Sequence, residues 1–533
     1  MGNDVKQIAA RELKAQLHDG SEIALLDARE EGIFARRHLL MASCVPLSRL
    51  ELMIDALVPR RSARTVWCDE GDGAAMRAAR RMVALGYEDV AVLDGGVAAW
   101  EAAGFRVYSG VHVPSKAFAE VVEHEAKTPY LTAPELKALI DKGADIAIFD
   151  SRSYEEYHDN SIPGAISVPG AELVYRFADL APSPDTTIIV NCGGRTRSII
   201  GAQSLRNAGF GNQIMSLKDG TMAWHLAGYD VVSGAGRRPP AVSAAGLAAA
   251  TQAAARVAAR CGIRRIDIAT LAAWRSEADR SLYVLDVRTP EEYAAGHLAG
   301  ARSAPGGQLV QETDAHIATW NARIVLVDDD GVRATMTASW LKQMGWGEVA
   351  VLTAGPNDGG WAAGPDRPLV LGLAGNAATT IEPAALRAAL GDGRTVVVDL
   401  DTSRAYARGH IPGAWFAIRS RLTEALGKIP AARQIVLTSP DGALARLAAA
   451  DLGEGGPAAI LALAGGTAAW ARAGYPLESG TPHMASAPDD VVLSARERGQ
   501  DREAAMHEYL AWEINLVHDM AQDDDQRFRV VAG

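Results

Sequence analysis

The chain has few cysteines and no long apolar run, and each shortage excludes a class of protein. Its 533 residues include only four cysteines, and no two of them form a CxxC motif. This scarcity argues against a disulfide framework and against a structural zinc site. No segment approaches the roughly 18 unbroken apolar residues that a membrane span requires. We therefore expect neither a metal site nor a membrane partner.

Two further features are missing. The first twenty residues lack the basic and then apolar layout of a signal peptide, which predicts a cytoplasmic location. An excess of positive charge is also absent, because 53 Lys and Arg face 65 Asp and Glu and leave a net charge of −12. An acidic surface repels phosphate backbones, so nucleic acid is not an expected partner.

What the chain does contain is one pattern repeated four times, and such a repeat governs the fold. Each copy opens with an apolar run that ends in an acidic residue: IALLDAR at 23–29, IAIFDSR at 146–152, LYVLDVR at 282–288 and VVVDLD at 396–401. A second apolar run follows about forty residues later and ends at Cys68, Cys192, Asp328 and Ser439. Each copy closes on a glycine turn and a tryptophan, at Trp100, Trp224, Trp361 and Trp470.

Short apolar strands that alternate with helical stretches predict βαβ units and parallel sheets, hence an α/β protein. We expect an alanine-rich helix over 244–260, and a helix over 503–520 that packs on the body of the protein. The predicted domains are 5–110, 128–236, 263–370 and 377–480, with a C-terminal tail at 481–533.

Four motifs together resemble the rhodanese superfamily of sulfurtransferases: the opening D-x-R, the G-H-[IL]-x-G-A turn, a cysteine at a strand end and the closing D-G-G-x-x-x-W. The resemblance covers residues 5–480 in four tandem copies. It implies four small doubly wound parallel-sheet domains. It also implies a cysteine in a strand-to-helix loop that takes up a sulfane sulfur as a persulfide and passes it to an acceptor.

The second copy has the complete loop, Cys192-Gly193-Gly194-Arg195-Thr196-Arg197-Ser198. Inward-pointing amides and the start of a helix stabilise an anion, so we expect a lowered pKa for the Cys192 thiol. The two glycines let the backbone curl around the sulfur. Both arginines can bind the oxygens of an anionic donor. The remaining contacts are backbone N–H groups of Gly193, Thr196 and Ser198, together with the Ser198 hydroxyl.

Structural interpretations stand beside these functional ones. Cys192 can be a core residue, and Arg195 or Arg197 can pair with carboxylates. The opening Asp150 and Arg152 are better explained as a structural ion pair than as catalytic groups, since copies without a cysteine keep them. The four terminal tryptophans are expected in the core.

The other three copies are predicted to be inactive. Asp328 and Ser439 replace the cysteine in the third and fourth copies, and neither side chain can form a persulfide. Cys68 falls at the nucleophile position of the first copy, but three carboxylates follow it and like charges raise a thiol pKa. It is either structural or an accessory thiol. Cys44 and Cys261 are expected to be packing residues.

The sequence therefore predicts a sulfurtransferase that moves sulfur from thiosulfate or another small anionic persulfide donor to a thiol or cyanide acceptor through a Cys192 persulfide. An acceptor protein is also compatible with the pattern, and no cofactor is implied. A phosphatase needs a Cys-x5-Arg loop, whereas Cys192 and Arg197 form Cys-x4-Arg. The alternative from a different class is a non-catalytic scaffold of rhodanese-like domains or a sulfur-carrier binding protein.

Overall fold

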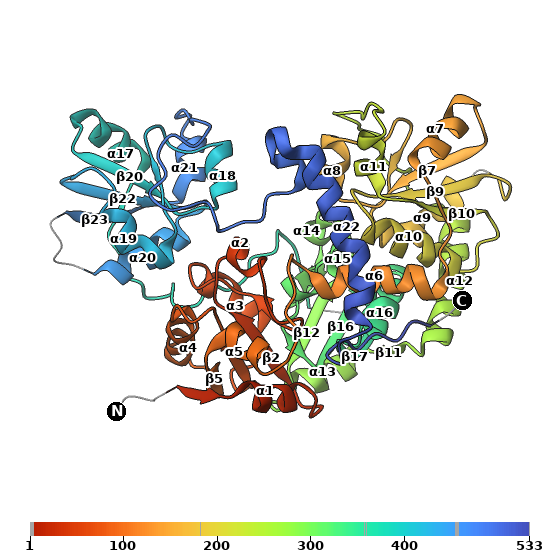
Figure 1. Cartoon of the computed structure of the whole chain (residues 1–533), viewed down its shortest axis with the longest axis horizontal. Helices are drawn as coiled ribbons and strands as arrows, with labels where there is room; N and C mark the ends of the chain where they lie inside the picture. Colours follow the sequence, from red (N-terminus) through yellow and green to blue (C-terminus); the bar gives the residue numbers. More distant parts are fainter. Residues whose placement is uncertain (1–4, 182, 356–357, 359, 454–457, 532–533) are drawn as a thin grey trace. The chain divides into compact units, whose positions relative to one another are not determined.

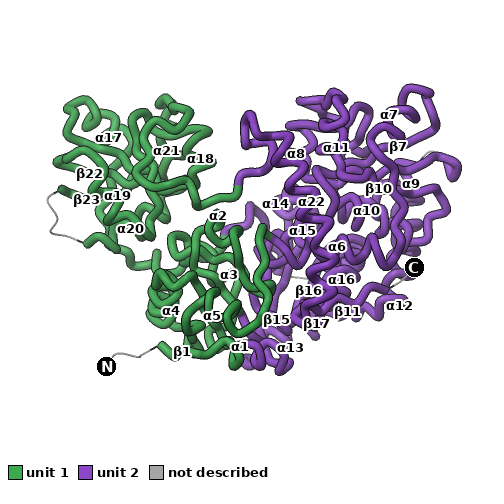
Figure 2. The backbone as a smooth tube through the Cα atoms, in the orientation of Figure 1, with its two compact units in different colours: residues 1–13, 25–111, 368–492 green, residues 14–24, 112–367, 493–533 purple. Residues whose placement is uncertain are grey.

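The computed structural model describes residues 5–181, 183–355, 358, 360–453 and 458–531. These residues form two compact units, coloured separately in Figure 2. Unit 1 contains residues 1–13, 25–111 and 368–492, and unit 2 contains residues 14–24, 112–367 and 493–533. The first and fourth repeats fall in unit 1, and the second and third fall in unit 2 with the C-terminal tail.

Unit 1 has one sheet from each of its two repeats. The first sheet places its parallel strands in the order β1-β5-β4-β2-β3, and the second has the order β19-β23-β22-β20-β21. The elements of the first repeat are β1 (Lys6–Ile8), α1 (Ala10–Leu17), β2 (Ile23–Asp27), α2 (Glu31–Phe34), β3 (Ser43–Cys44), α3 (Leu50–Leu57), β4 (Thr65–Cys68), α4 (Ala74–Ala84), β5 (Val90–Leu93) and α5 (Gly96–Ala102). Those of the fourth repeat are β19 (Thr380–Ile381), α17 (Pro383–Ala389), β20 (Thr395–Asp399), α18 (Ser403–Arg408), β21 (Trp415–Phe416), α19 (Leu422–Leu426), β22 (Gln434–Thr438), α20 (Ala443–Leu452), β23 (Ala459–Leu463) and α21 (Gly466–Arg472).

Unit 2 repeats this strand order twice, as β6-β10-β9-β7-β8 and β11-β17-β16-β12-β14. The second repeat contains β6 (Tyr130–Leu131), α7 (Ala133–Asp141), β7 (Ile146–Asp150), α8 (Tyr154–Asp159), β8 (Ile166–Ser167), α9 (Glu172–Leu180), β9 (Thr187–Asn191), α10 (Thr196–Asn207), β10 (Ile214–Leu217) and α11 (Gly220–Leu226). The third contains β11 (Arg264–Ile266), α13 (Ile268–Ser276), β12 (Leu282–Asp286), α14 (Pro290–Ala295), β13 (His297–Leu298), β14 (Arg302–Ser303), α15 (Gly306–Gln311), β15 (Thr319–Trp320), β16 (Ala322–Asp328), α16 (Val332–Met344), β17 (Gly347–Thr353) and β18 (Trp361–Ala362). Three further helices of unit 2 lie outside the repeats: α6 (Val113–Ala126), α12 (Ala244–Cys261) and α22 (Arg502–Met520).

Each of the four repeats has one sheet whose own strands are parallel, which confirms the predicted α/β class. Helices α12 and α22 confirm the helices expected over 244–260 and 503–520. Helix α12 packs against α9 and α16, and one apolar core runs from Phe149 through Ala254 to Met336. The second and third repeats therefore share a core within unit 2; Figure 1 labels the helices α9, α12 and α16 that contribute to it.

The repeated aromatic residue explains the turn that follows it. The Tyr157 hydroxyl donates to the carbonyl of Ala165 at 3.0 Å, and the tyrosines of the third and fourth repeats make the same bond at 2.9 and 2.7 Å. In the first repeat Phe34 has no hydroxyl and stacks on His38, with 4.0 Å between ring centroids. A buried tyrosine hydroxyl thus satisfies a buried carbonyl, as interiors require.

The four terminal tryptophans lie in the apolar cores or pack against them, as predicted. Trp100, Trp224 and Trp470 are at most 1% exposed and belong to the core. Trp361 is half-buried in the short strand β18, which pairs with β13, and it packs against the apolar core of the third repeat. The glycine turn before it includes residues 356, 357 and 359, which lie outside the described residues.

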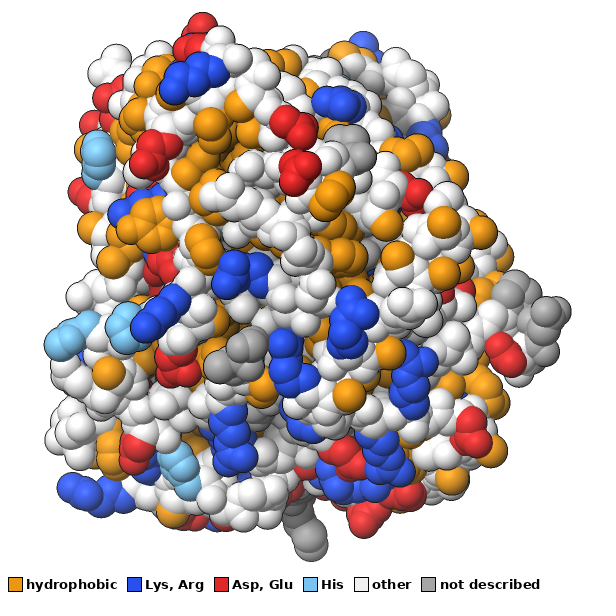
Figure 3. All heavy atoms as spheres, turned by 90° about the vertical axis from the view of Figure 1, so that its right-hand side faces the viewer, with side chains coloured by type: hydrophobic (Ala, Val, Ile, Leu, Met, Phe, Trp, Pro, Cys, Tyr) orange, Lys and Arg blue, Asp and Glu red, His pale blue; other side chains and the backbone are white. Residues whose placement is uncertain are grey.

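Among the described residues, no helix has both the length and the apolarity needed to cross a membrane. The face drawn in Figure 3 carries apolar, basic and acidic side chains side by side. On that face the apolar side chains are interrupted by charged ones of both signs, as is ordinary for a protein surface.

Candidate active site

The Cys192 loop (residues 192–198) connects the end of β9 to the start of α10. Strand β9 lies in the middle of its sheet, between β10 and β7, so the loop emerges at the carboxyl edge of the parallel strands. Ligands of open α/β sheets bind at this edge. The predicted strand, cysteine and helix therefore occur in the expected order, and the site lies where the fold places chemistry.

The closing glycine turn of the repeat fixes the shape of this loop. The N–H of Thr221 donates to the carbonyl of Cys192 at 2.9 Å, and that of Met222 donates to Gly193 at 3.1 Å. Gly220 has a φ of +52°, and a Cβ there would lie 2.3 Å from the carbonyl oxygen of Cys192. Only glycine permits both this left-handed backbone and this approach.

The opening aspartate and arginine of the repeat form the predicted structural ion pair. Arg152 donates from Nε and Nη2 to the Asp150 carboxylate at 2.9 and 2.7 Å, and both side chains are buried. Asp150 also accepts from the side chain of Asn191 at 3.1 Å. This pair braces the end of β7 against the residue before Cys192, so it positions the loop and leaves the sulfur free of the carboxylate.

Equivalent hydrogen bonds align the four loops residue by residue. The turn N–H that meets Cys192 in the second repeat meets Asp69 in the first and Ser439 in the fourth, each at 2.9 Å. A second equivalent N–H, from the residue after the opening aspartate, donates to the carbonyl one residue earlier in each loop. From the first repeat to the fourth, these acceptors are Cys68, Asn191, Val327 and Thr438. The residue at the position of Cys192 is thus Asp69, Asp328 or Ser439 in the other repeats.

This alignment corrects the prediction that Cys68 occupies the nucleophile position. Cys68 is the counterpart of Asn191, one residue earlier on the strand, because the strand pairing and not the cysteine sets the register. Its sulfur donates to the buried Asp27 carboxylate at 3.6 Å. Burial and this carboxylate raise the pKa of Cys68 well above its ordinary value. Cys68 is therefore built as a structural partner of Asp27.

An oxygen fills each of the three other loops. Six residues after the Cys192 counterpart, a backbone N–H points back to it: Ala75 donates to Asp69 at 2.9 Å and Ala334 to Asp328 at 3.0 Å. Ala445 donates to the Ser439 hydroxyl at 3.3 Å. In the second repeat the N–H of Ser198 interacts with the Cys192 sulfur instead. This backbone N–H is common to all four repeats, and only in the second does it meet a sulfur.

The sequence-based expectation for the pKa of Cys192 is wrong. The side chain is 2% exposed, and this burial raises the pKa of the thiol; Arg197 and Ser198 act in the opposite direction. The Cys192 sulfur also donates to the Ser198 hydroxyl at 3.4 Å. The expectation of a lowered pKa considered the loop alone, whereas other elements of unit 2 cover the loop and remove water from the sulfur.

Both loop arginines contact carboxylates. Arg195 is 4% exposed and donates to Glu120 at 2.7 Å and to Asp219 at 2.8 Å, with Glu123 as a third partner. The helix α6 that provides Glu120 and Glu123 lies outside the repeats, and no signal near Arg195 in the sequence points to it. Arg195 therefore clamps α6 and the turn before α11 to the loop, and its predicted contact with a donor anion stays a prediction.

Arg197 is the loop cation coupled to the thiol. It donates to Glu156 at 2.6 and 2.7 Å and to the Gln308 side chain at 2.9 Å. Burial acts to raise the pKa of Glu156, but Arg197 beside it lowers that pKa to about 2. The charge of Arg197 lowers the pKa of Cys192, so its field reaches the sulfur while Glu156 holds its guanidinium in place.

The C-terminal tail provides site residues that sequence reasoning missed. Thr196 donates its hydroxyl to Glu513 of α22 at 2.5 Å, across 317 residues of sequence. Arg496 donates to the Thr221 hydroxyl at 2.6 Å. Tyr509 and Glu513 both lie against Gly194. The tail was predicted to pack on the body, and the structure places it on the Cys192 loop.

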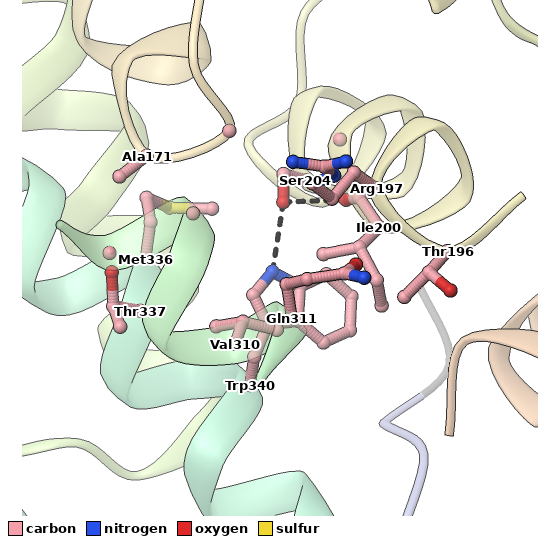
Figure 4. Close-up of a pocket in the computed structure, with 14 residues that line it drawn as sticks. Ala171, Thr196, Arg197, Ile200, Ser204, Val310, Gln311, Met336, Thr337 and Trp340 are labelled. Carbon is pink, nitrogen blue, oxygen red and sulfur yellow. Dashed lines mark hydrogen bonds between the residues drawn. The ribbon is translucent and has the colours of Figure 1, made fainter. Parts of the chain in front are cut away.

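A small cavity lies beside the Cys192 loop, where α10 meets α15 and α16 (Figure 4). Its volume is about 30 Å³, and Thr196, Arg197 and Trp340 are among its lining residues. Trp340 closes it by donating its indole N–H to Ser204 at 2.9 Å, the dashed line in Figure 4. A volume of this size has room for a water molecule.

Comparison with known proteins places these observations in a family. The profile described as Rhodanese-like domain matches residues 9–103, 132–227, 268–361 and 382–473. The crystal structure of a thiosulfate sulfurtransferase from Pseudomonas aeruginosa is 48% identical, with a TM-score of 0.95 over 99% of this chain and 100% of that chain.

Two curated proteins match shorter segments. An HTH-type transcriptional regulator of Mycobacterium tuberculosis is 36% identical over 106 residues, which are 20% of this chain and 45% of that protein. A candidate sulfur carrier protein of Bacillus subtilis is 26% identical over 102 residues, 19% of this chain and 54% of that protein. The chain thus spans about half the length of these relatives. The four profile matches and the whole-chain likeness show that the chain belongs to the rhodanese-like domain family, with four such domains in tandem.

Proposed function

We propose that this chain is a sulfurtransferase that carries sulfane sulfur on Cys192. The observation behind the proposal is the alignment of the four loops. In each repeat an equivalent backbone N–H points back into the loop, and it meets an oxygen at Asp69, Asp328 and Ser439 and the sulfur at Cys192. Only this sulfur can form a persulfide, so one loop in four is chemically competent.

Thiosulfate is the donor that the comparisons support, since the whole-chain structural relative is a thiosulfate sulfurtransferase. In the first step the Cys192 thiolate attacks the outer sulfur of thiosulfate, the sulfur–sulfur bond breaks, and sulfite leaves with the electron pair. In the second step a thiolate or cyanide attacks the sulfane sulfur of the Cys192 persulfide, and the thiolate of Cys192 leaves. A small persulfide donor would react by the same steps.

The loop would stabilise the persulfide anion in two ways. The backbone N–H of Ser198 interacts with the sulfur, those of Gly193 and Thr196 would add to it, and hydrogen bonds to an anion favour the charged form. Arg197 adds a positive field that already acts on Cys192. Gly194 keeps the loop narrow, and Arg195 contributes by holding α6 on the loop through Glu120.

Intact-protein mass spectrometry after incubation with thiosulfate tests this function. Wild type is expected to gain one sulfur, about 32 Da, and to lose it again on treatment with cyanide. The Cys192→Ser variant is expected to gain nothing. If wild type gains no sulfur from thiosulfate or from glutathione persulfide, the enzyme proposal fails and a non-catalytic scaffold or sulfur-carrier binding protein takes its place.

A further inference from the structure

Helix α22 brings one buried carboxylate to the Cys192 loop. Figure 1 shows α22 lying against α6, and its Glu513 is 1% exposed. Oε1 of Glu513 accepts the Thr196 hydroxyl at 2.5 Å. Oε2 lies 3.3 Å from where a Cβ on Gly194 would stand, two residues along the loop from Cys192. This carboxylate therefore faces the loop.

The second oxygen of this carboxylate has no assigned partner. Among the residues that the structure describes, Oε2 of Glu513 is buried and makes no hydrogen bond. A buried, unpaired polar oxygen costs free energy, and a buried carboxylate costs more. Thr196 satisfies only Oε1. Oε2 therefore lowers the stability of the fold, and it remains at the loop as a hydrogen-bond acceptor that can take a proton.

The charged groups around Glu513 affect its pKa and that of the Cys192 thiol. Burial raises the pKa of Glu513; the Thr196 hydroxyl, Lys116 of α6 and Arg195 of the loop act to lower it, and Asp219 adds to the rise. Glu513 in turn raises the pKa of Cys192, and it raises that of Tyr509 on its own helix. The other charged groups that face this region are Glu120 and Arg197.

A thiolate at Cys192 and a carboxylate at Glu513 would be two like charges in a space largely closed to water. Like charges disfavour each other's ionisation, so the thiolate forms more readily when its proton passes to the carboxylate. The thiol of Cys192 is buried with a raised pKa and needs a proton acceptor before it can attack. Glu513 is a buried carboxylate beside the loop with an unused lone pair.

We propose that Glu513 accepts the proton of Cys192 when the thiol becomes a nucleophile, a role that rests on the proposed function. The S–H bond of Cys192 breaks, the proton goes to the Glu513 carboxylate, and the thiolate attacks the outer sulfur of the donor as sulfite leaves. When cyanide or a thiolate takes the sulfane sulfur, Cys192 leaves as a thiolate and recovers its proton from Glu513. Atoms and charge balance over the cycle, and no further reactant is needed.

A purely electrostatic role for Glu513 predicts the opposite result on mutation. If its charge only repels, then Glu513→Gln removes a negative neighbour, lowers the pKa of Cys192 and speeds every reaction of the thiol. If Glu513 is the proton acceptor, the same variant slows these reactions, because glutamine cannot take the proton. The sign of the change therefore separates the two roles.

The experiment measures the rate of sulfur loading from thiosulfate. It also measures, independently, the rate at which iodoacetamide alkylates Cys192. Both rates are followed from about pH 6 to about pH 9, the range around the pH at which a proton acceptor of this kind acts. The full chain is compared with Glu513→Gln and with Glu508→Gln, a matched change at an exposed glutamate of the same helix. We expect Glu513→Gln to slow both reactions at least ~10-fold at neutral pH, and Glu508→Gln to leave them unchanged.

Unchanged or faster reactions in Glu513→Gln would overturn the proposal. The Glu513→Asp variant gives a second test, because it keeps a carboxylate on a shorter arm; we expect it to be several-fold slower than wild type, and equal rates would count against the proposal even if Glu513→Gln did not fold. Alkylation needs no sulfur transfer. A wild type that fails to load sulfur but shows the alkylation effect would thus refute the proposed function and leave the role of Glu513 supported.

Discussion

Gly220→Ala is expected to loosen the Cys192 loop without touching any reactive group. The new Cβ would lie 2.3 Å from the carbonyl oxygen of Cys192 and 2.7 Å from that of Gly194, both rigid backbone atoms. The turn must shift, and the two bonds that it makes to the loop, at 2.9 and 3.1 Å, are lost. At about 1 kcal/mol each these bonds contribute about 2 kcal/mol, and the left-handed φ adds about 1–2 kcal/mol.

Gly228→Ala provides the control for backbone strain. Gly228 follows the same helix with a φ of +77°, and a Cβ there meets nothing within 4 Å. It should therefore cost only the backbone contribution of about 1–2 kcal/mol. The difference of about 2 kcal/mol belongs to the lost contact between turn and loop, and it corresponds to about a 30-fold change in an opening equilibrium.

Hydrogen exchange of a peptide that covers residues 190–198 measures this opening. We expect the peptide to exchange about 30-fold faster in Gly220→Ala than in Gly228→Ala, with a parallel loss of sulfur loading. Equal exchange in the two variants would refute the argument, since the glycine turn would then have no part in holding the loop.

Two further predictions concern single residues of unit 1 and unit 2. Cys68→Ser should load sulfur from thiosulfate as fast as wild type, because Cys68 lies one residue before the nucleophile position; a loss of loading, measured by intact mass, would contradict the alignment of the loops. Glu156→Gln should reduce resistance to acid: the folded pKa of Glu156 is about 2 against an ordinary 4.5, so its stabilisation is complete above pH 4.5 and is lost as the pH falls toward 2. Circular dichroism during acid titration should show that the variant lacks the stabilisation that Glu156 gives to the wild type. Identical acid transitions in the two proteins would exclude the ion pair with Arg197 as the source of that stabilisation.

The three oxygen-filled loops explain how degenerate repeats keep the fold. A nest of backbone amides needs an acceptor, and a buried N–H without one is costly. Asp69 and Asp328 provide carboxylate oxygens and Ser439 a hydroxyl, so each loop closes on itself. These repeats have no thiol at this position and retain the packing. This separation of fold and chemistry is expected when function depends on a few grafted residues.

The tail has a different relation to the fold. Its helix α22 adds no strand to any sheet, and it is anchored on the loop by Thr196 and on α6 by packing. Lys116 of α6 lies over the rings of Tyr509 and Trp512, at 5.4 and 5.1 Å from their centroids. The tail thus packs on the Cys192 loop at Gly194 and Thr196, and its Glu513 adds to the rise in the pKa of the Cys192 thiol that burial causes.

The sequence by itself determined the repeat, the α/β class and the placement of Cys192 between a strand and a helix. These are local properties: apolar runs, glycine turns and the spacing of motifs repeat every hundred residues or so and are readable without long-range contacts. The helices at 244–260 and 503–520 were predictable for the same reason, since composition and period specify a helix within one segment.

Only the tertiary structure decided the register of the first loop, the partners of the arginines and the ionisation of the thiol. Strand pairing shows that Asp69, and not Cys68, matches Cys192, because hydrogen bonds between neighbouring strands set the register and the sequence motif does not. Glu513 reaches Thr196 across 317 residues. Burial of Cys192 follows from such distant contacts, so a pKa argued from the loop alone had the wrong sign.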